Sequence, residues 1–229
     1  MIDPEHVRAY MRGFYGYGSY SARYWFIGLE EGGASSVSDL KGRIDVWRAL
    51  GEHEVEDLSA FHQAMGSGSW FGATPKRQAT WARLIQILLA AEGRPSSSED
   101  ILQYQSTRLG RSNGESLLAE LMPLPAKNLN TWYASELNLP ELRSRSDYRK
   151  AIAPGRIAHL KEKIVQHQPH AVIFYGARRG WPQLLDIDFE PGNACDRGRL
   201  GPTRLLAMKH PAAYGVRREE WESVARSIG

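Results

Sequence analysis

The stretch RYWFIGLEEGG, residues 23–33, predicts the centre of the fold. Its nearly unbroken apolar run is interrupted once, at Gly28, and Glu30 and Glu31 follow directly. A short apolar run of this kind favours a buried strand that leads into a tight turn. Open α/β sheets bind ligands at such strand ends, and two buried glutamates would be unfavourable without a partner or a task. The alternative interpretation is an acidic turn in solvent.

The composition of the 229 residues is ordinary for a soluble globular protein, with 42% hydrophobic and 24% charged residues. We expect one domain over residues 1–229, with a helical insertion at about 34–65. The formal net charge of +3 is compatible with an anionic partner but does not require one. No apolar run approaches the ~20 residues of a membrane span, and the N-terminus lacks the apolar core of a signal peptide. We therefore expect a cytoplasmic protein that does not enter a membrane.

Several kinds of site are excluded or lack a signature. Cys195 is the single cysteine, which excludes an intrachain disulfide, a cysteine-ligated iron–sulfur cluster and a cysteine-ligated zinc site. No paired histidines indicate a catalytic metal, and neither a phosphate-binding Walker loop nor a GxSxG nucleophile motif is present. We expect no metal and no cofactor.

Three further apolar segments follow the pattern of the first. HAVIFYG (170–176) predicts a buried strand, TRLLAMKHP (203–211) is a similar run, and LLAELMPL (117–124) fits either a strand or a helix. Helical spacing predicts a helix over 146–168, which Pro154 and Gly155 should divide. The expected strands cover about residues 24–29, 118–123, 170–175 and 203–208. Strands that alternate with helices predict an α/β fold with a mostly parallel four-stranded sheet and helices on both faces.

Polar side chains follow three of these strands, and parallel strands would bring them to one edge of the sheet. The residues expected to share this cleft are Glu30, Glu31, Glu120, Asn128 and His210. The Gly/Ser-rich loop GSGSWFGATPKR (66–77) would place Trp70 and Phe71 beside them. Each residue taken alone also fits a structural role, because a lone histidine is more often structural and an aromatic side chain is more often core.

Five segments, in this order, resemble motifs of the uracil-DNA glycosylase superfamily. They are FIGLEEGG, SGSWFGATPKRQATWARLIQILL, AELMPLPAKN, RIAHLKEKIVQHQPHAVIFYG and RLLAMKHPAAYG, and they cover about residues 23–33 and 66–228. The resemblance implies a three-layer α/β/α fold and a monomeric, monofunctional DNA glycosylase. Such an enzyme flips a nucleotide of DNA into a pocket and hydrolyses its N-glycosidic bond, which leaves an abasic site. The implied roles are DNA repair or defence against phage with modified DNA.

The resemblance also implies roles for individual residues. Glu30 stands where some family members carry a catalytic aspartate, Glu31 is the second candidate, and His210 matches a histidine that hydrogen-bonds the negative charge developing on the base. Base binding is implied for Gly28, Glu120 and Asn128, and for Phe71 as the stacking aromatic residue, with Trp70 as its alternative. DNA contact is implied for Lys209, Pro211, Ala212, Tyr214 and Arg217, with Tyr214 filling the space that the flipped nucleotide leaves.

Departures from the family pattern bear on the substrate. Glu31 replaces a proline, and Ala212 replaces a serine that contacts phosphate. Glu120 lies near the position of an asparagine that reads uracil. An amide suits the acceptor and donor of uracil, whereas a carboxylate suits the amino group of cytosine. The sequence therefore points to a cytosine-type base, plain or modified, such as the glucosylated hydroxymethylcytosine of phage DNA.

Two alternative functions stay open at this point. The chain fits a non-catalytic DNA-binding module on the same fold, which would bind DNA in a salt-sensitive way and release no base. It also fits a hydrolase of small nucleosides or nucleotides.

Overall fold

The computed structural model of the chain describes residues 2–127 and 131–228. Its centre is a seven-stranded mixed sheet in the order β3-β1-β4-β2-β5-β7-β6. The four middle strands are mutually parallel: β4 (Ser116–Met122), β2 (Tyr24–Glu30), β5 (Ala171–Gly176) and β7 (Thr203–Lys209). These are the four strands that the sequence predicts, so the α/β class is confirmed, whereas a sheet of only four strands is wrong.

Three strands were not predicted, because their sequences lack a periodic pattern of apolar residues. β1 (Gly16–Tyr17) and β3 (Val55–Glu56) are only two residues long. β6 (Cys195–Leu200), CDRGRL, is a polar edge strand that pairs antiparallel with β7. Charged side chains are typical of edge strands, where they oppose pairing with other chains. A second antiparallel pairing, of β1 with β4, makes the sheet mixed rather than wholly parallel.

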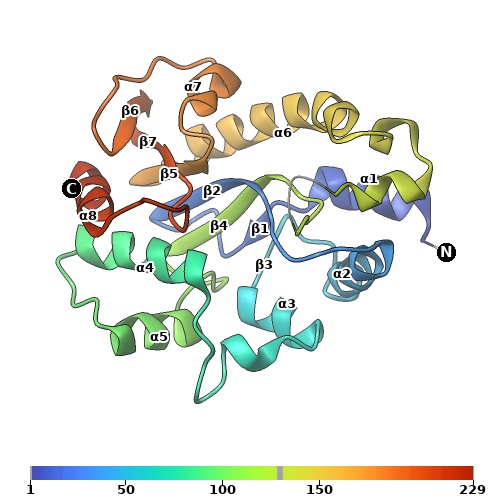
Figure 1. Cartoon of the computed structure of the whole chain (residues 1–229), viewed down its shortest axis with the longest axis horizontal. Helices are drawn as coiled ribbons and strands as arrows, with labels where there is room; N and C mark the ends of the chain where they lie inside the picture. Colours follow the sequence, from blue (N-terminus) through green and yellow to red (C-terminus); the bar gives the residue numbers. More distant parts are fainter. Residues whose placement is uncertain (1, 128–130, 229) are drawn as a thin grey trace.

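Helices lie on both sides of the sheet (Figure 1). The helices are α1 (Pro4–Gly13), α2 (Val37–Ala49), α3 (Leu58–Ala64), α4 (Ala79–Ala91), α5 (Ser98–Thr107), α6 (Arg145–His167), α7 (Gly180–Leu185) and α8 (Arg218–Ile228). In Figure 1, α6 and α7 lie above the strands, and α4, α5 and α8 lie below them. None of the helices that the structure describes is long and apolar enough to cross a membrane.

Strand β2 forms the buried centre of the sheet. Tyr24 to Ile27 are at most 1% exposed, and the strand has a parallel neighbour on each side. Strands covered on both faces favour continuous apolar runs of this kind. The strand extends beyond the expected end at residue 29, because it continues to Glu30, which pairs with Met122 of β4. The first glutamate therefore belongs to the strand and not to a turn.

Two other expectations need correction. Helix α6 runs unbroken through Pro154, and therefore Pro154 and Gly155 do not divide it. The insertion at 34–65 is helical only in part, since β3 lies between α2 and α3 and pairs with β1. This pairing ties the insertion to the sheet.

Arg156 of α6 is a buried cation that joins three elements. It is 2% exposed, and its guanidinium donates to the backbone carbonyls of Leu121, Glu120 and Met11 at 2.6, 2.8 and 3.1 Å. The guanidinium carbon also lies 3.8 Å from the ring centre of Tyr15. These hydrogen bonds fix α6 against the strand that carries Glu120.

Replacing Arg156 with methionine should destabilise the fold strongly. The variant keeps a long side chain but leaves three buried carbonyls without this donor, and each such loss costs about 1–3 kcal/mol. We expect the free energy of unfolding to fall by at least about 3 kcal/mol in urea titrations. Arg12→Met, on an exposed position of α1, is the control and should change it by less than about 0.5 kcal/mol. Equal effects of the two substitutions would contradict this account.

Candidate functional site

A cavity of about 610 Å³ lies at the carboxyl ends of the central parallel strands. The strand ends and the turn after β2 contribute Glu30, Glu31, Gly32, Gly33, Ala34, Glu120, Tyr175 and His210. The insertion contributes Asp39, Arg43, His62 and Met65, and the following segment contributes Ser67, Trp70, Gln78, Thr80 and Trp81. The cavity therefore gathers four of the five residues that the sequence expected in one cleft. The fifth, Asn128, lies outside the described residues.

Glu30, at the end of β2, is paired with an arginine from the start of α6. Arg145 donates to both carboxylate oxygens of Glu30, and its guanidinium lies 4.9 Å from the ring centre of Trp132. Ser144 caps this helix by accepting a hydrogen bond from the backbone of Asp147. Burial raises the pKa of the Glu30 carboxyl, although the charge of Arg145 opposes the shift. Both carboxylate oxygens of Glu30 are thus engaged by Arg145.

Glu31 is held from two other directions. Its Oε1 accepts hydrogen bonds from Arg43 of α2 at 2.9 Å and from the Tyr17 hydroxyl at 3.0 Å. Its backbone carbonyl accepts from Ala126 at 2.8 Å, which fixes the turn after β2 against the loop after β4. Within residues 2–127 and 131–228, no hydrogen bond to Oε2 of Glu31 is found. One oxygen of this carboxylate therefore remains for a ligand or a water molecule.

Glu120 of β4 has the most unusual environment of the three. It lies opposite Gly28, and a Cβ added to Gly28 would come within 2.2 Å of the Glu120 Oε2. Gly28 is thus needed to let the carboxyl group lie across β2. On the far side, the Tyr175 hydroxyl of β5 donates to Oε1 at 2.8 Å. Oε2 is buried and has no hydrogen-bond partner among the described residues.

This environment changes the protonation of Glu120. Burial raises the pKa of its carboxyl group from 4.5 to about 8, opposed by the Tyr175 hydrogen bond and reinforced by the charges of Glu31 and Glu30. The group is therefore protonated at neutral pH. A protonated carboxyl group donates one hydrogen bond and still accepts others, unlike the carboxylate that the sequence suggested.

His210 lies just beyond the end of β7. Its Nδ1 accepts a hydrogen bond from the backbone N–H of Ala212 at 3.2 Å, and burial lowers the pKa of the imidazole. A neutral ring that accepts at Nδ1 carries its proton on Nε2. His210 therefore presents an N–H donor. Its ring packs edge-on against Tyr175, with centroids 5.6 Å apart.

Aromatic rings form one wall of the cavity. Trp70 and Trp81 pack edge to face, with centroids 6.0 Å apart, and His62 meets Trp81 edge-on at 5.4 Å. Phe71 is not among the lining residues, since it packs against Trp81 and His62 instead. The placement favours Trp70 over Phe71 as the aromatic residue that meets a ligand. Gly28 is likewise beneath the Glu120 carboxyl group rather than in the lining.

The predicted DNA-contacting residues lie in or beside the loop between β7 and α8. Lys209, Ala212 and Arg217 are exposed, and Tyr214 is fully exposed. Pro211 is buried, which disagrees with its predicted contact to DNA. Tyr214 is the larger of two exposed hydrophobic side chains in the described ranges.

Sequence reasoning missed several cavity residues. Tyr175 gave a weak signal, since it is the one polar-tipped residue of HAVIFYG near the strand end. Trp81 lines the cavity, but it gave no separate signal, because its helical spacing with Leu84, Ile85 and Leu88 is typical of a core-facing stripe. Arg43 and His62 gave no signal, because nothing local places the insertion over the strand ends. Their roles follow only from the long-range pairing of β3 with β1.

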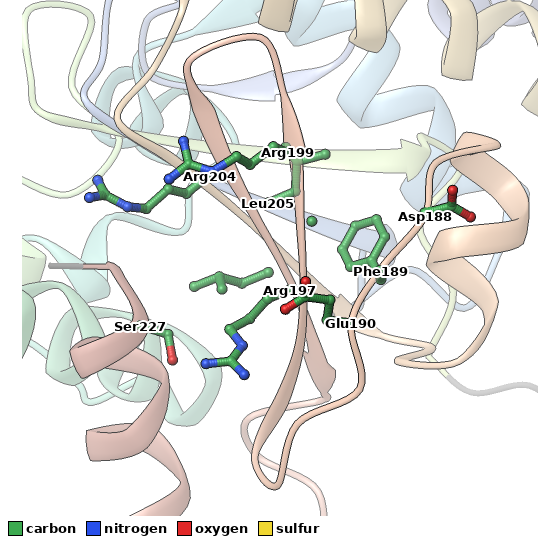
Figure 2. Close-up of a pocket in the computed structure, with 10 residues that line it drawn as sticks. Asp188, Phe189, Glu190, Arg197, Arg199, Arg204, Leu205 and Ser227 are labelled. Carbon is green, nitrogen blue, oxygen red and sulfur yellow. The ribbon is translucent and has the colours of Figure 1, made fainter.

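A second cavity, of about 570 Å³, lies along β6 and β7 (Figure 2). Arg197, Arg199 and Arg204 extend from the paired strands toward the side on which Ser227 of α8 lies. Arg204 pairs with Arg199 near the start of β7, whereas His210 follows its end. None of the predicted site residues lines this cavity, and the first cavity is therefore the candidate site.

Comparisons with known proteins add no family assignment: no protein-family model and no curated protein matches the chain. In the described ranges 2–127 and 131–228, no group of three or more His, Cys, Asp or Glu is placed to hold a metal ion. The function is therefore argued from the cavity itself.

The raised pKa of Glu120 should make stability depend on pH. Between about pH 4.5 and 8, the Glu120 carboxyl group is deprotonated in the unfolded chain but still protonated in the folded protein. The free energy of unfolding of the wild type should therefore fall by up to about 1.4 kcal/mol for each pH unit in this range. Glutamine does not titrate. The free energy of unfolding of Glu120→Gln, relative to wild type, should therefore rise from pH 5 to 8 and level off above pH 8.

Urea unfolding at pH 5, 6, 7 and 8 tests this expectation. These pH values span the range in which the difference in the free energy of unfolding should build up. Glu162→Gln, on an exposed position of α6, is the matched control and should follow the wild type at every pH. A constant difference between Glu120→Gln and wild type would contradict the assigned protonation.

Proposed function

We propose that the protein is a monofunctional DNA glycosylase that flips a cytosine-type nucleotide into the cavity and hydrolyses its N-glycosidic bond. The observation that supports the proposal is that five predicted site residues line one cavity at the ends of parallel strands. They are Glu30, Glu31, Glu120, Trp70 and His210. The cavity supplies negative charge, a neutral N–H donor and an aromatic wall. The three-layer glycosylase-like fold, the single domain and the cytoplasmic role in repair or defence are parts of the same proposal.

The reaction needs negative charge near the sugar. As the bond to the base breaks, positive charge develops on the sugar and a water molecule must attack it. Glu31 suits this task best, because its Oε2 is not engaged by the described chain while Arg43 and Tyr17 fix its Oε1. Glu30, held by Arg145, adds electrostatic stabilisation without contacting water.

The departing base needs a donor for its negative charge. His210 suits this role because its Nε2 carries the proton and burial keeps the ring neutral. A neutral N–H aimed at a pyrimidine carbonyl strengthens its hydrogen bond as charge accumulates on the oxygen. Trp70 offers a ring on which the flipped base can stack.

Glu120 can pair with a cytosine-type base. Because Tyr175 donates to Oε1, the proton of the neutral carboxyl group belongs on Oε2. The group then offers a donor at Oε2 and an acceptor at Oε1. Cytosine presents a complementary pair, an acceptor at N3 and an amino donor at position 4.

DNA binding would use the loop after β7. Lys209 and Arg217 are exposed cations on the segment that carries His210, and the exposed ring of Tyr214 suits the space left by a flipped nucleotide. Flipping costs a few kcal/mol, which contacts of this kind offset.

The decisive experiment measures base release from duplex oligonucleotides. Duplexes carry a single cytosine, uracil, hypoxanthine, hydroxymethylcytosine or glucosylated hydroxymethylcytosine, and alkali-labile abasic sites are scored. We expect excision of a cytosine-type base, and Glu31→Gln should reduce the rate by about 10²–10⁴-fold. Glu30→Gln should reduce it less, and Glu162→Gln should leave it unchanged.

The alternative functions give different outcomes in the same assay. Salt-sensitive DNA binding with no abasic product from any duplex would indicate a binding module. Release of free base from nucleosides or nucleotides, but not from duplexes, would indicate a small-molecule hydrolase. Rates of Glu31→Gln and Glu30→Gln that both match the wild type would refute the proposed mechanism.

A further inference from the structure

His62 is a cavity residue to which no role has been assigned. It lies on α3 within the insertion and is 9% exposed, yet it lines the cavity. Four aromatic rings surround it, with ring centroids 5.3 Å away for Tyr17, 5.4 Å for Trp81, 5.8 Å for Phe71 and 6.1 Å for Phe61. A ring packed on several sides has a fixed orientation, and the polar atom that it presents is therefore a fixed property of the site.

The tautomer of His62 follows from its one hydrogen bond. Nδ1 lies 2.9 Å from the backbone carbonyl of Leu58, which only accepts, so Nδ1 must carry the proton. Burial lowers the pKa of the imidazole, which keeps the ring neutral. Nε2 then holds a lone pair, and the hydrogen bond that the described residues make to the ring is at Nδ1.

The two histidines of the cavity are thus opposite in character. His210 accepts at Nδ1 from Ala212 and presents an N–H at Nε2, whereas His62 donates at Nδ1 and presents a lone pair at Nε2. One lies beyond the end of β7 and the other on the insertion, so they approach the cavity from different elements. A ligand that satisfies both has an acceptor group at one end and a donor group at the other.

We propose that His62 is a ligand-binding residue whose Nε2 accepts a hydrogen bond from a hydroxyl or amino group of the molecule bound in the cavity. On the proposed function, from which this inference extends, that molecule is a flipped pyrimidine. The donor is then a hydroxyl-bearing substituent at position 5, because the amino group at position 4 pairs with Glu120. The insertion at 34–65 is accordingly a specificity element that selects ligands carrying such a donor over ligands carrying a methyl group.

The proposal can be tested without any cleavage reaction. Side-chain ¹⁵N spectra of the ligand-free wild type should show His62 as the Nδ1–H tautomer. The protein is then titrated with cytidine, 5-methylcytidine and 5-hydroxymethylcytidine. The chemical shift of the His62 Nε2 resonance should change when the bound nucleoside carries a donor group that reaches this atom. An Nε2 resonance that does not move with any of the three nucleosides overturns the proposal.

Substitutions separate hydrogen bonding from packing. His62→Phe keeps an aromatic ring but lacks an acceptor, and it should weaken binding of 5-hydroxymethylcytidine relative to 5-methylcytidine by about 3–10-fold. His62→Gln retains an acceptor oxygen and should recover part of that preference. His53→Phe, at a largely exposed histidine before β3, is the control and should bind like the wild type.

The outcomes distinguish this inference from the proposed function. Nucleoside binding at His62 without abasic product from any duplex would leave the inference in place and refute the glycosylase activity. Unchanged ligand preference in His62→Phe would overturn the inference, whatever the duplex assay gives. If His62→Phe does not fold, the ¹⁵N titration of the wild type decides the matter alone.

Discussion

The carboxyl group of Glu120 lies across the backbone of Gly28, and the geometry of the cavity depends on this contact. Any side chain at Gly28 would displace the carboxyl group, and its displacement would break the hydrogen bond from Tyr175. Three neighbouring parallel strands therefore share one buried acidic group. Its burial, more than any neighbouring charge, sets its protonation.

The other two glutamates of the cavity are stabilised by ion pairs. Each is met by an arginine from a distant segment, Arg145 for Glu30 and Arg43 for Glu31. Pairing of this kind offsets the loss of hydration that an isolated carboxylate would suffer. The three carboxyl groups of the cavity are consequently not equivalent: two are neutralised by cations, and one is neutralised by a proton. This difference is what allows separate tasks to be assigned to them.

Much of the sheet was predictable because its middle strands are buried on both faces. Runs such as YWFI and AVIFY carry the signature of parallel strands, and their order along the chain fixed which ends converge. The edge strand CDRGRL was not predictable, since its pairing with β7 depends on a partner and not on its own apolar content. Within the site, the glutamates and His210 lie near the carboxyl ends of strands and were predicted. Arg43 and His62 were not, because the insertion reaches the cavity only through tertiary packing.

Helix α6 carries two of the arginines on which the site depends, and their spacing has an evolutionary consequence. Arg145 holds Glu30, and Arg156 binds the backbone of the strand that bears Glu120. The eleven steps between them make about three turns of helix, which places both on one face. Insertion or deletion of one residue between them would rotate one arginine by about 100° relative to the other. Related sequences that keep this site should therefore tolerate substitutions in this segment but not changes in its length.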